Sequence, residues 1–185
     1  MYNILILDDQ PPIINAMRRA IDRIPSDLLD SRCRVHGFDN PENALASLRD
    51  VTYDAVVSDL RMPGVDGLDF LRQARELQPD AVRILISGHG DLPSAIAAIN
   101  DIGVFRFVAK PWDDAELQVT LALALQTRAM QGENQRLADE VRVQRGQLSE
   151  QDARLRELEA ECPGITRVER DDSGAIVLDE RDLQA

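Results

Sequence analysis

Apolar residues in the first 125 positions form short runs that alternate with segments of helical spacing. Continuous runs at 3–7, 55–57 and 82–86 are typical of strands buried on both faces, and shorter runs at 33–38 and 105–108 bring the number of expected strands to five. Apolar side chains recur at intervals of three and four in 11–24, 41–49, 67–77 and 93–99, which predicts helices. Strict alternation with short connections predicts a doubly wound α/β fold with a parallel sheet.

Local signals mark where these helices begin. Pro11 and Pro12 suit the first turn of a helix, where a missing N–H costs nothing. Asp39 or Asn40 is placed to cap the helix at 41–49, and Gly67 opens the helix at 67–77.

A different pattern begins at Asp113, after which no strong helix breaker occurs before Pro163. A helix of about 49 residues would be roughly 73 Å long and needs a partner beyond the first domain. Apolar residues with polar interruptions follow a heptad in which position a includes Asn134 and Val141. We therefore expect a coiled coil at 126–162, although Gln144 and Gln151 at position d leave a solvated single helix as the alternative.

The last segment, residues 163–185, has two short apolar runs on either side of Asp171, Asp172, Ser173 and Gly174. Such a pattern predicts a β-hairpin, which would be marginal unless it packs on other structure.

Polar residues whose side chains can bind ions or take part in reactions lie at the carboxyl ends of the expected strands. Asp8 and Asp9 follow the first strand, Asp59 the third, Ser87 the fourth and Lys110 the fifth. A sheet of order 2-1-3-4-5, as in flavodoxin-like folds, places the first and third strands side by side at its switch point. We therefore expect these side chains to converge in one crevice.

Composition narrows the function. The net charge of −12 is the opposite of the positive charge that attracts nucleic acid or an anionic membrane. No apolar run reaches membrane-spanning length. Two cysteines do not make a disulfide framework, which favours a reducing cytoplasm. Of the 21 basic side chains, Lys110 is the single lysine, which suggests that its chemistry matters.

Residues 1–125 resemble the receiver domain of two-component response regulators. The resemblance rests on Asp8–Asp9, Asp59 with Met62–Pro63–Gly64 and Asp66–Gly67, Ser87–Gly88, Phe107 and Lys110–Pro111, all at the spacings of the family. The segment 105–114 further resembles receivers found beside output domains such as cyclic-di-GMP phosphodiesterases.

The resemblance implies a Mg²⁺ (or Mn²⁺) site held by Asp9 and Asp59, by Asp8 largely through water, and by the backbone carbonyl of Arg61. Asp59 would be the nucleophile that accepts a phosphoryl group, with Lys110 and Ser87 placed to stabilise the added charge. Chemistry would be confined to self-phosphorylation and self-dephosphorylation.

Further roles follow from the same resemblance. Ser87 and Phe107 occupy switch positions, although a permanently buried Phe107 is the alternative. Arg61 and His89 lie at rim positions that influence water near the phosphoryl group, and Lys110–Pro111 matches a cis peptide of the family.

The resulting hypothesis is a response regulator that accepts a phosphoryl group from a sensor histidine kinase and signals to an output protein through a parallel homodimer. Asn134 would set the register of that dimer, and its seam would be completed by Leu137, Val141, Leu148, Leu155 and Leu158. The alternatives are the amino-terminal part of a larger effector, for example in cyclic-di-GMP turnover, and a haloacid-dehalogenase-like phosphatase. The phosphatase family requires an Asp-x-Asp pattern on its first strand, whereas this strand ends in Asp8–Asp9–Gln10.

Overall fold

Five parallel strands form the central sheet of the protein. The structure is a computed structural model that describes residues 1–88 and 102–161. The sheet order is β2-β1-β3-β6-β7, which confirms the predicted order of the five strands, 2-1-3-4-5. The strands are β1 (Tyr2–Leu7), β2 (Cys33–Phe38), β3 (Ala55–Asp59), β6 (Val82–Gly88) and β7 (Val104–Lys110).

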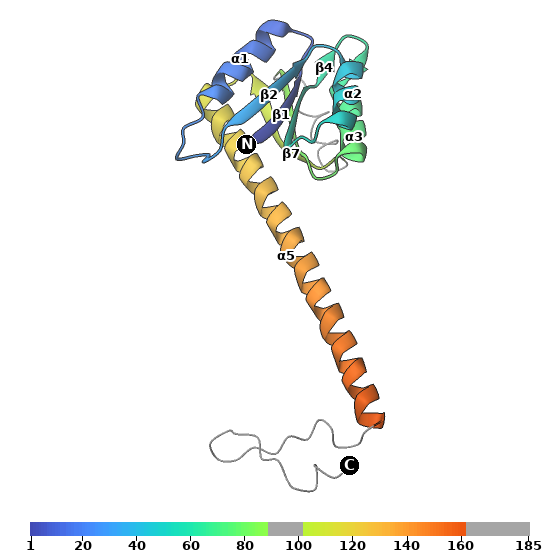
Figure 1. The fold of residues 1–185 in the computed structure, drawn as a ribbon. Helices are drawn as coiled ribbons and strands as arrows, with labels where there is room; N and C mark the ends of the chain where they lie inside the picture. The colour runs from blue at the N-terminus through green and yellow to red at the C-terminus, as the bar shows by residue number, and fades with distance from the viewer. Residues whose placement is uncertain (89–101, 162–185) are drawn as a thin grey trace. The chain divides into compact units, whose positions relative to one another are not determined.

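Side chains alternate between two apolar layers, one on each face of the sheet. On one face, Ile4 and Ile6 of β1 pack with apolar residues of α1 (Pro11–Asp22) and of the first turns of α5 (Asp114–Glu161). On the other face, Leu5 and Leu7 pack with α2 (Pro41–Asp50) and α3 (Gly67–Leu77). Figure 1 shows α1 and the start of α5 on the opposite side of the sheet from α2 and α3. Because both faces are covered, the inner strands β1, β3 and β6 each contain a continuous run of buried apolar residues, as the sequence pattern predicted.

The described helices begin where their capping signals lie. Asn40 caps α2 by accepting hydrogen bonds from the backbone N–H groups of Glu42 (2.8 Å) and Asn43 (3.2 Å). The carboxylate of Asp113 does the same for the first turn of α5. The predicted helix at 93–99 lies outside the described residues.

A small antiparallel pair, β4 (Arg61–Met62) and β5 (Val65–Asp66), follows β3 and was not predicted. Its turn contains Gly64 at φ 82°, a conformation that favours glycine. The pair folds the loop after Asp59 back on itself, so that α3 begins immediately beside the end of β3.

The chain divides into two compact units, Met1–Gly132 and Glu133–Ala185. In the second unit the structure describes residues 133–161, all of them within α5. Its large apolar side chains are exposed: Leu137, Val141, Val143, Leu148, Leu155 and Leu158. The predicted hairpin in 163–185 lies outside the described residues. None of the described helices combines the length and the apolar character needed to cross a membrane.

Candidate phosphoryl-transfer site

The carboxyl ends of the strands bring the expected polar residues to one edge of the sheet. Asp8 directly follows β1, and Asp59 is the last residue of β3. In the ladder between β3 and β6, Asp59 is level with Ile86, so Ser87 comes one residue later. Lys110 ends β7, level with Gly88 of β6. Parallel register alone therefore gathers these residues at one edge.

Lys110 joins the two buried carboxylates of this edge. Its Nζ lies 2.7 Å from Oδ2 of Asp8 and 3.0 Å from Oδ1 of Asp59. The side chain of Lys110 is 20% exposed, whereas that of Asp8 is fully buried and that of Asp59 nearly so. The other oxygen of Asp8 accepts a hydrogen bond from the backbone N–H of Gln10 at 2.9 Å. Ion pairs shielded in this way are stronger than those on the surface.

The two directions of pKa shift agree with this geometry. Burial raises the pKa of Asp59, and the nearby Asp8 carboxylate raises it further, while Lys110 acts in the opposite direction. Burial opposes the charge on Lys110, but its hydrogen bonds to Asp8 and Asp59 outweigh that effect and raise the pKa of the ammonium. The site therefore holds Lys110 charged, and it favours any cation that relieves the crowding of carboxylates.

Three carboxylates are close enough to share one ion. Oxygen atoms of Asp8, Asp9 and Asp59 lie within 4.8 Å of one another. Oδ1 of Asp9 is buried and has no hydrogen-bond partner among the residues that the structure describes. A buried oxygen without a partner is costly, and a hard divalent cation supplies what it lacks. The donor set of Asp8, Asp9 and Asp59 therefore fits Mg²⁺ or Mn²⁺.

The remaining predicted residues are placed less uniformly. Ser87 is buried at the end of β6. Phe107 is half-buried and packs against the apolar layer shared with α2 and α3, so it is neither fully enclosed nor fully exposed. Arg61 is exposed on β4, and His89 lies outside the described residues. The Lys110–Pro111 peptide is cis, as the resemblance implied.

Gly67 contributes to the site in a way that the sequence did not indicate. A Cβ atom added to Gly67 would lie 1.8 Å from the backbone oxygen of Asp59. The N–H of Gly67 donates to the carbonyl of Leu60 at 2.9 Å, and Asp66 caps the helix through the N–H of Leu68. The Asp–Gly pair signalled a helix start, but its contact with Asp59 depends on the fold.

Comparison with known proteins decides the family. The family model described as response regulator receiver domain matches residues 4–122. The chain belongs to this family. The hydrogenase transcriptional regulatory protein HoxA of Cupriavidus necator is 34% identical over 140 residues, which cover 76% of this chain and 27% of HoxA. The cyclic di-GMP phosphodiesterase response regulator RpfG of Xanthomonas campestris is 37% identical over 128 residues, 68% of this chain and 32% of RpfG.

Among solved structures, an uncharacterized protein from Neptuniibacter caesariensis has a TM-score of 0.65 and 34% identity, over 72% of this chain and 93% of that one. Receiver domains are signalling modules that interact with histidine kinases and bind Mg²⁺ at an acidic pocket, and this receiver has an acidic pocket of that kind. The chain spans about a third or less of the length of HoxA and of RpfG. The similarity therefore covers the receiver and not the remaining parts of those two proteins.

Proposed function

We propose that Asp59 accepts a phosphoryl group from a histidine kinase and that the chain passes this signal on through its helical extension. One observation carries the proposal: Lys110 Nζ lies within hydrogen-bonding distance of both Asp8 and Asp59, beside the unpartnered oxygen of Asp9. An accessible ammonium next to a crowded set of carboxylates is suited to a group that arrives with negative charge.

In the proposed reaction, an oxygen of Asp59 attacks the phosphorus of the donor. A bond forms between that oxygen and phosphorus, and the bond from phosphorus to the leaving group of the donor breaks and its electron pair leaves with that group. Lys110 turns from a carboxylate partner of Asp59 toward an oxygen of the transferred group. A bound Mg²⁺ would supply further positive charge at this place.

Acetyl phosphate with Mg²⁺ tests the assignment. Intact-mass measurement should show one phosphoryl increment on the wild-type chain and none on Asp59→Asn or after chelation of the metal. Asp39→Asn is the matched control, because Asp39 is an exposed carboxylate just after β2 at the same edge of the sheet, and it should be labelled normally. Labelling that persists in Asp59→Asn would remove the central role of Asp59.

Ser87 and Phe107 form the proposed switch. Movement of the Ser87 hydroxyl toward the phosphoryl oxygens would change the space beside β7, where Phe107 lies half-buried. A partly exposed ring has room to move inward, which supports this role over that of a fixed core residue. Arg61 and His89 are proposed to control the approach of water from the rim.

The extension, taken as residues 126–162 after a receiver at 1–125, is proposed to form a parallel homodimer. Leu137, Val141, Leu148, Leu155 and Leu158 each expose 42–59% of their surface in the single chain, and association would bury them. A buried Asn at position a is best paired with another Asn, which for Asn134 requires matched parallel chains. Pairs such as Glu140 with Arg145 of the second chain would add only a few tenths of a kcal/mol each.

Sedimentation of the full chain against a truncation ending at Gln126 tests the dimer. The full chain should sediment as a dimer at micromolar concentration and the truncation as a monomer. A monomeric full chain would contradict this part of the proposal while leaving phosphorylation of Asp59 intact.

The output partner is proposed to be a protein or a further domain. HoxA and RpfG carry different functions in their printed names, a transcriptional regulator and a cyclic di-GMP phosphodiesterase, so the receiver family itself does not decide between them. The acidic charge of −12 disfavours direct contact of the present chain with nucleic acid. Sequencing of the adjacent coding region, for a kinase or a continued reading frame, separates an independent regulator from the first part of a larger effector.

A further inference from the structure

Three polar side chains tie the receiver part of α5 to neighbouring elements of the first unit. Gln118 donates to the carbonyl of Ala20 at 2.9 Å, at the end of α1. Gln126 donates to the carbonyl of Leu28 at 2.8 Å, in the connection between α1 and β2. Arg128 pairs with Asp80, in the connection between α3 and β6. The last turns of α5 within the first unit are therefore held by two connections that follow helices starting at the site.

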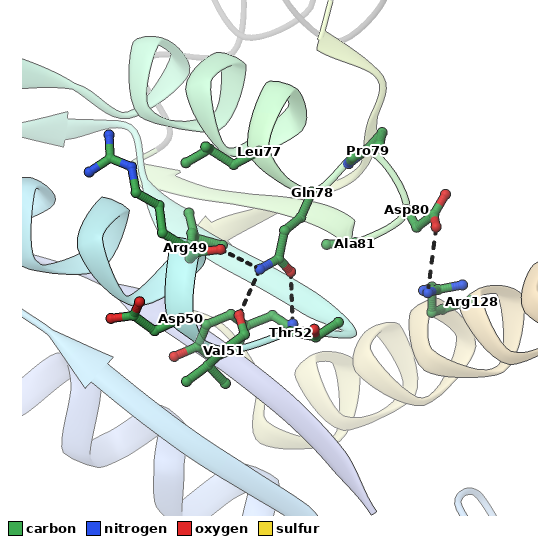
Figure 2. Close-up of a pocket in the computed structure, with 12 residues that line it drawn as sticks. Arg49, Asp50, Val51, Thr52, Leu77, Gln78, Pro79, Asp80, Ala81 and Arg128 are labelled. Carbon is green, nitrogen blue, oxygen red and sulfur yellow. Dashed lines mark hydrogen bonds and ion pairs between the residues drawn. The ribbon is translucent and has the colours of Figure 1, made fainter.

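The contact between Arg128 and Asp80 is the least constrained of the three. Its Nη2 to Oδ2 distance is 3.8 Å, and the Asp80 side chain is 78% exposed. Nε of Arg128 is buried and has no hydrogen-bond partner among the described residues. Figure 2 shows this ion pair at the rim of a pocket of about 350 Å³. A single ion pair with one exposed partner adds little to stability, so it can form and break without unfolding the receiver.

The connection that carries Asp80 is stiff. The side-chain amide of Gln78 donates to the carbonyls of Leu48 and Val51, both at 2.7 Å, and accepts from the N–H of Tyr53 at 2.8 Å. Figure 2 shows the Gln78 side chain extending to the end of α2 and to the connection between α2 and β3. Gln78 therefore ties the end of α3 to the connection between α2 and β3, and a displacement of α3 that carries Gln78 also moves the backbone that leads to Asp80.

Arg83 braces the same connection from β6. Its guanidinium donates to the carbonyls of Pro79 (3.1 Å) and Ala81 (2.8 Å), on either side of Asp80. The backbone on either side of Asp80 is therefore held by β6 as well as by its connection to α3, and the exposed side chain of Asp80 takes no part in placing it.

The other end of α3 rests on the proposed phosphoacceptor. Gly67 is the first residue of α3, and the place that its Cβ would occupy is already filled by the backbone carbonyl of Asp59. The same residue donates its N–H to the carbonyl of Leu60. Any change in the backbone at Asp59 therefore presses directly on the first turn of a helix of 11 residues.

We propose that α3 transmits the state of Asp59 to α5 and that the Asp80–Arg128 ion pair is the coupling between the two helices. This inference rests on the proposed phosphorylation of Asp59 and adds a route for it separate from Ser87 and Phe107. Packed helices move as rigid pieces, so a shift at Gly67 appears at Asp80, where a weak contact responds by forming or breaking. The turn of α5 from Gln126 to Gly132 is the element whose position depends on that contact.

Hydrogen exchange on the full chain, measured with and without acetyl phosphate and Mg²⁺, tests the coupling. In the wild-type chain, phosphorylation should change exchange in peptides covering residues 117–132 by at least about threefold. Arg128→Gln should abolish that change while intact mass shows Asp59 still phosphorylated. Arg136→Gln is the matched control, because Arg136 loses the same charge on the same helix and pairs only with Glu133 in the contacts described for it.

A charge exchange completes the test. The single variant Asp80→Arg should behave like Arg128→Gln, and the double variant Asp80→Arg with Arg128→Asp should recover the response. A response of wild-type size in Arg128→Gln, or a double variant that stays unresponsive, would overturn the coupling. Phosphorylation of the wild-type chain with no change in 117–132 would also overturn it and leave the role of Asp59 intact. A chain that does not label at Asp59 would refute both.

Discussion

Lys110 is held by two carboxylates, and the strength of their attraction for its ammonium depends on their burial. Asp8 and Asp59 are shielded from water, and so their attraction for the ammonium is screened far less than that of a surface pair. The shape of the cation then matters as well as its charge. A compact ammonium can contact one oxygen of each carboxylate, whereas the planar fork of arginine prefers both oxygens of one.

Lys110→Arg should therefore impair the response to phosphorylation although the charge is kept. We expect acetyl phosphate still to label Asp59, more slowly, with the change in hydrogen exchange lost or reduced. Arg34→Lys, the reverse exchange at an exposed position of β2, should leave both measurements unchanged. If Lys110→Arg responds as the wild-type chain does, the geometry of the ammonium has no special role.

Gly67→Ala tests the contact between α3 and Asp59. The added methyl group would meet a backbone oxygen rather than a flexible side chain, so relief requires movement of the helix or of the strand end. We expect the free energy of unfolding to fall by about 3 kcal/mol, as for overpacking that the surroundings cannot absorb. Urea denaturation measures the change, and an unfolding midpoint equal to that of the wild-type chain would show that α3 has room to shift.

Cys33 should be a slow thiol. Burial raises its pKa from 9.0 to about 11, and the carboxylates of Asp54 and Asp22 add to the effect. A pKa that is higher by about two lowers the thiolate fraction at pH 8 about a hundredfold, and the thiolate is the reactive form. In a Cys162→Ser background, iodoacetamide should modify Cys33 about a hundredfold more slowly in the native chain than in urea.

The pH dependence of Cys33 has a definite sign. The rate of alkylation should rise with pH until about pH 11, where the native thiol ionises. Because the folded state favours the neutral thiol, its contribution to stability is complete below pH 9 and is lost as the pH rises through about 11. A rate that levels off near pH 9 in the native chain would contradict the burial of the thiol.

At the scale of elements, the sequence predicted what periodicity and capping determine. The five strands of the central sheet and the described helices were predicted within a few residues, because buried parallel strands and amphipathic helices leave clear patterns. The β4–β5 pair was not predicted because two-residue strands are too short to show a period. The contact of Gln78 with the backbone of Val51 was not predictable either. A polar Gln in a connection has no sequence pattern that indicates a partner, and the contact arises because the fold brings two connections together.

The two glycines within α5 differ in their surroundings, and so should their replacements. A Cβ at Gly146 meets nothing within 4 Å, whereas one at Gly132 would lie 3.3 Å from the guanidinium of Arg128. Gly146→Ala should therefore increase helix stability by about 1 kcal/mol. Gly132→Ala should gain less, because the Arg128 side chain must give way. Circular dichroism during thermal melting measures both, and a larger gain for Gly132→Ala would show that its neighbourhood is open.

At the scale of the whole molecule, strand order was enough to predict the convergence of the site. Asp8, Asp59 and Lys110 lie at strand ends, and a parallel sheet of known order leaves only one place for them to meet. The partners of each oxygen were not predictable in this way. Asp8 contacts Lys110 through one oxygen and the N–H of Gln10 through the other, and these partners depend on the path of the loop after β1.

The single lysine also has a practical consequence for chemical labelling. Apart from the N-terminal amine, Lys110 is the chain's one primary amine, and its head group sits in the candidate site. Acylating dyes, amine cross-linkers and amine-coupled sensor surfaces would therefore attach either at the N-terminus or at Lys110. Attachment at Lys110 would block the candidate site and remove the response under study. A thiol reagent leaves Lys110 untouched. Because Cys33 is slow to react, such a reagent should modify Cys162 before Cys33.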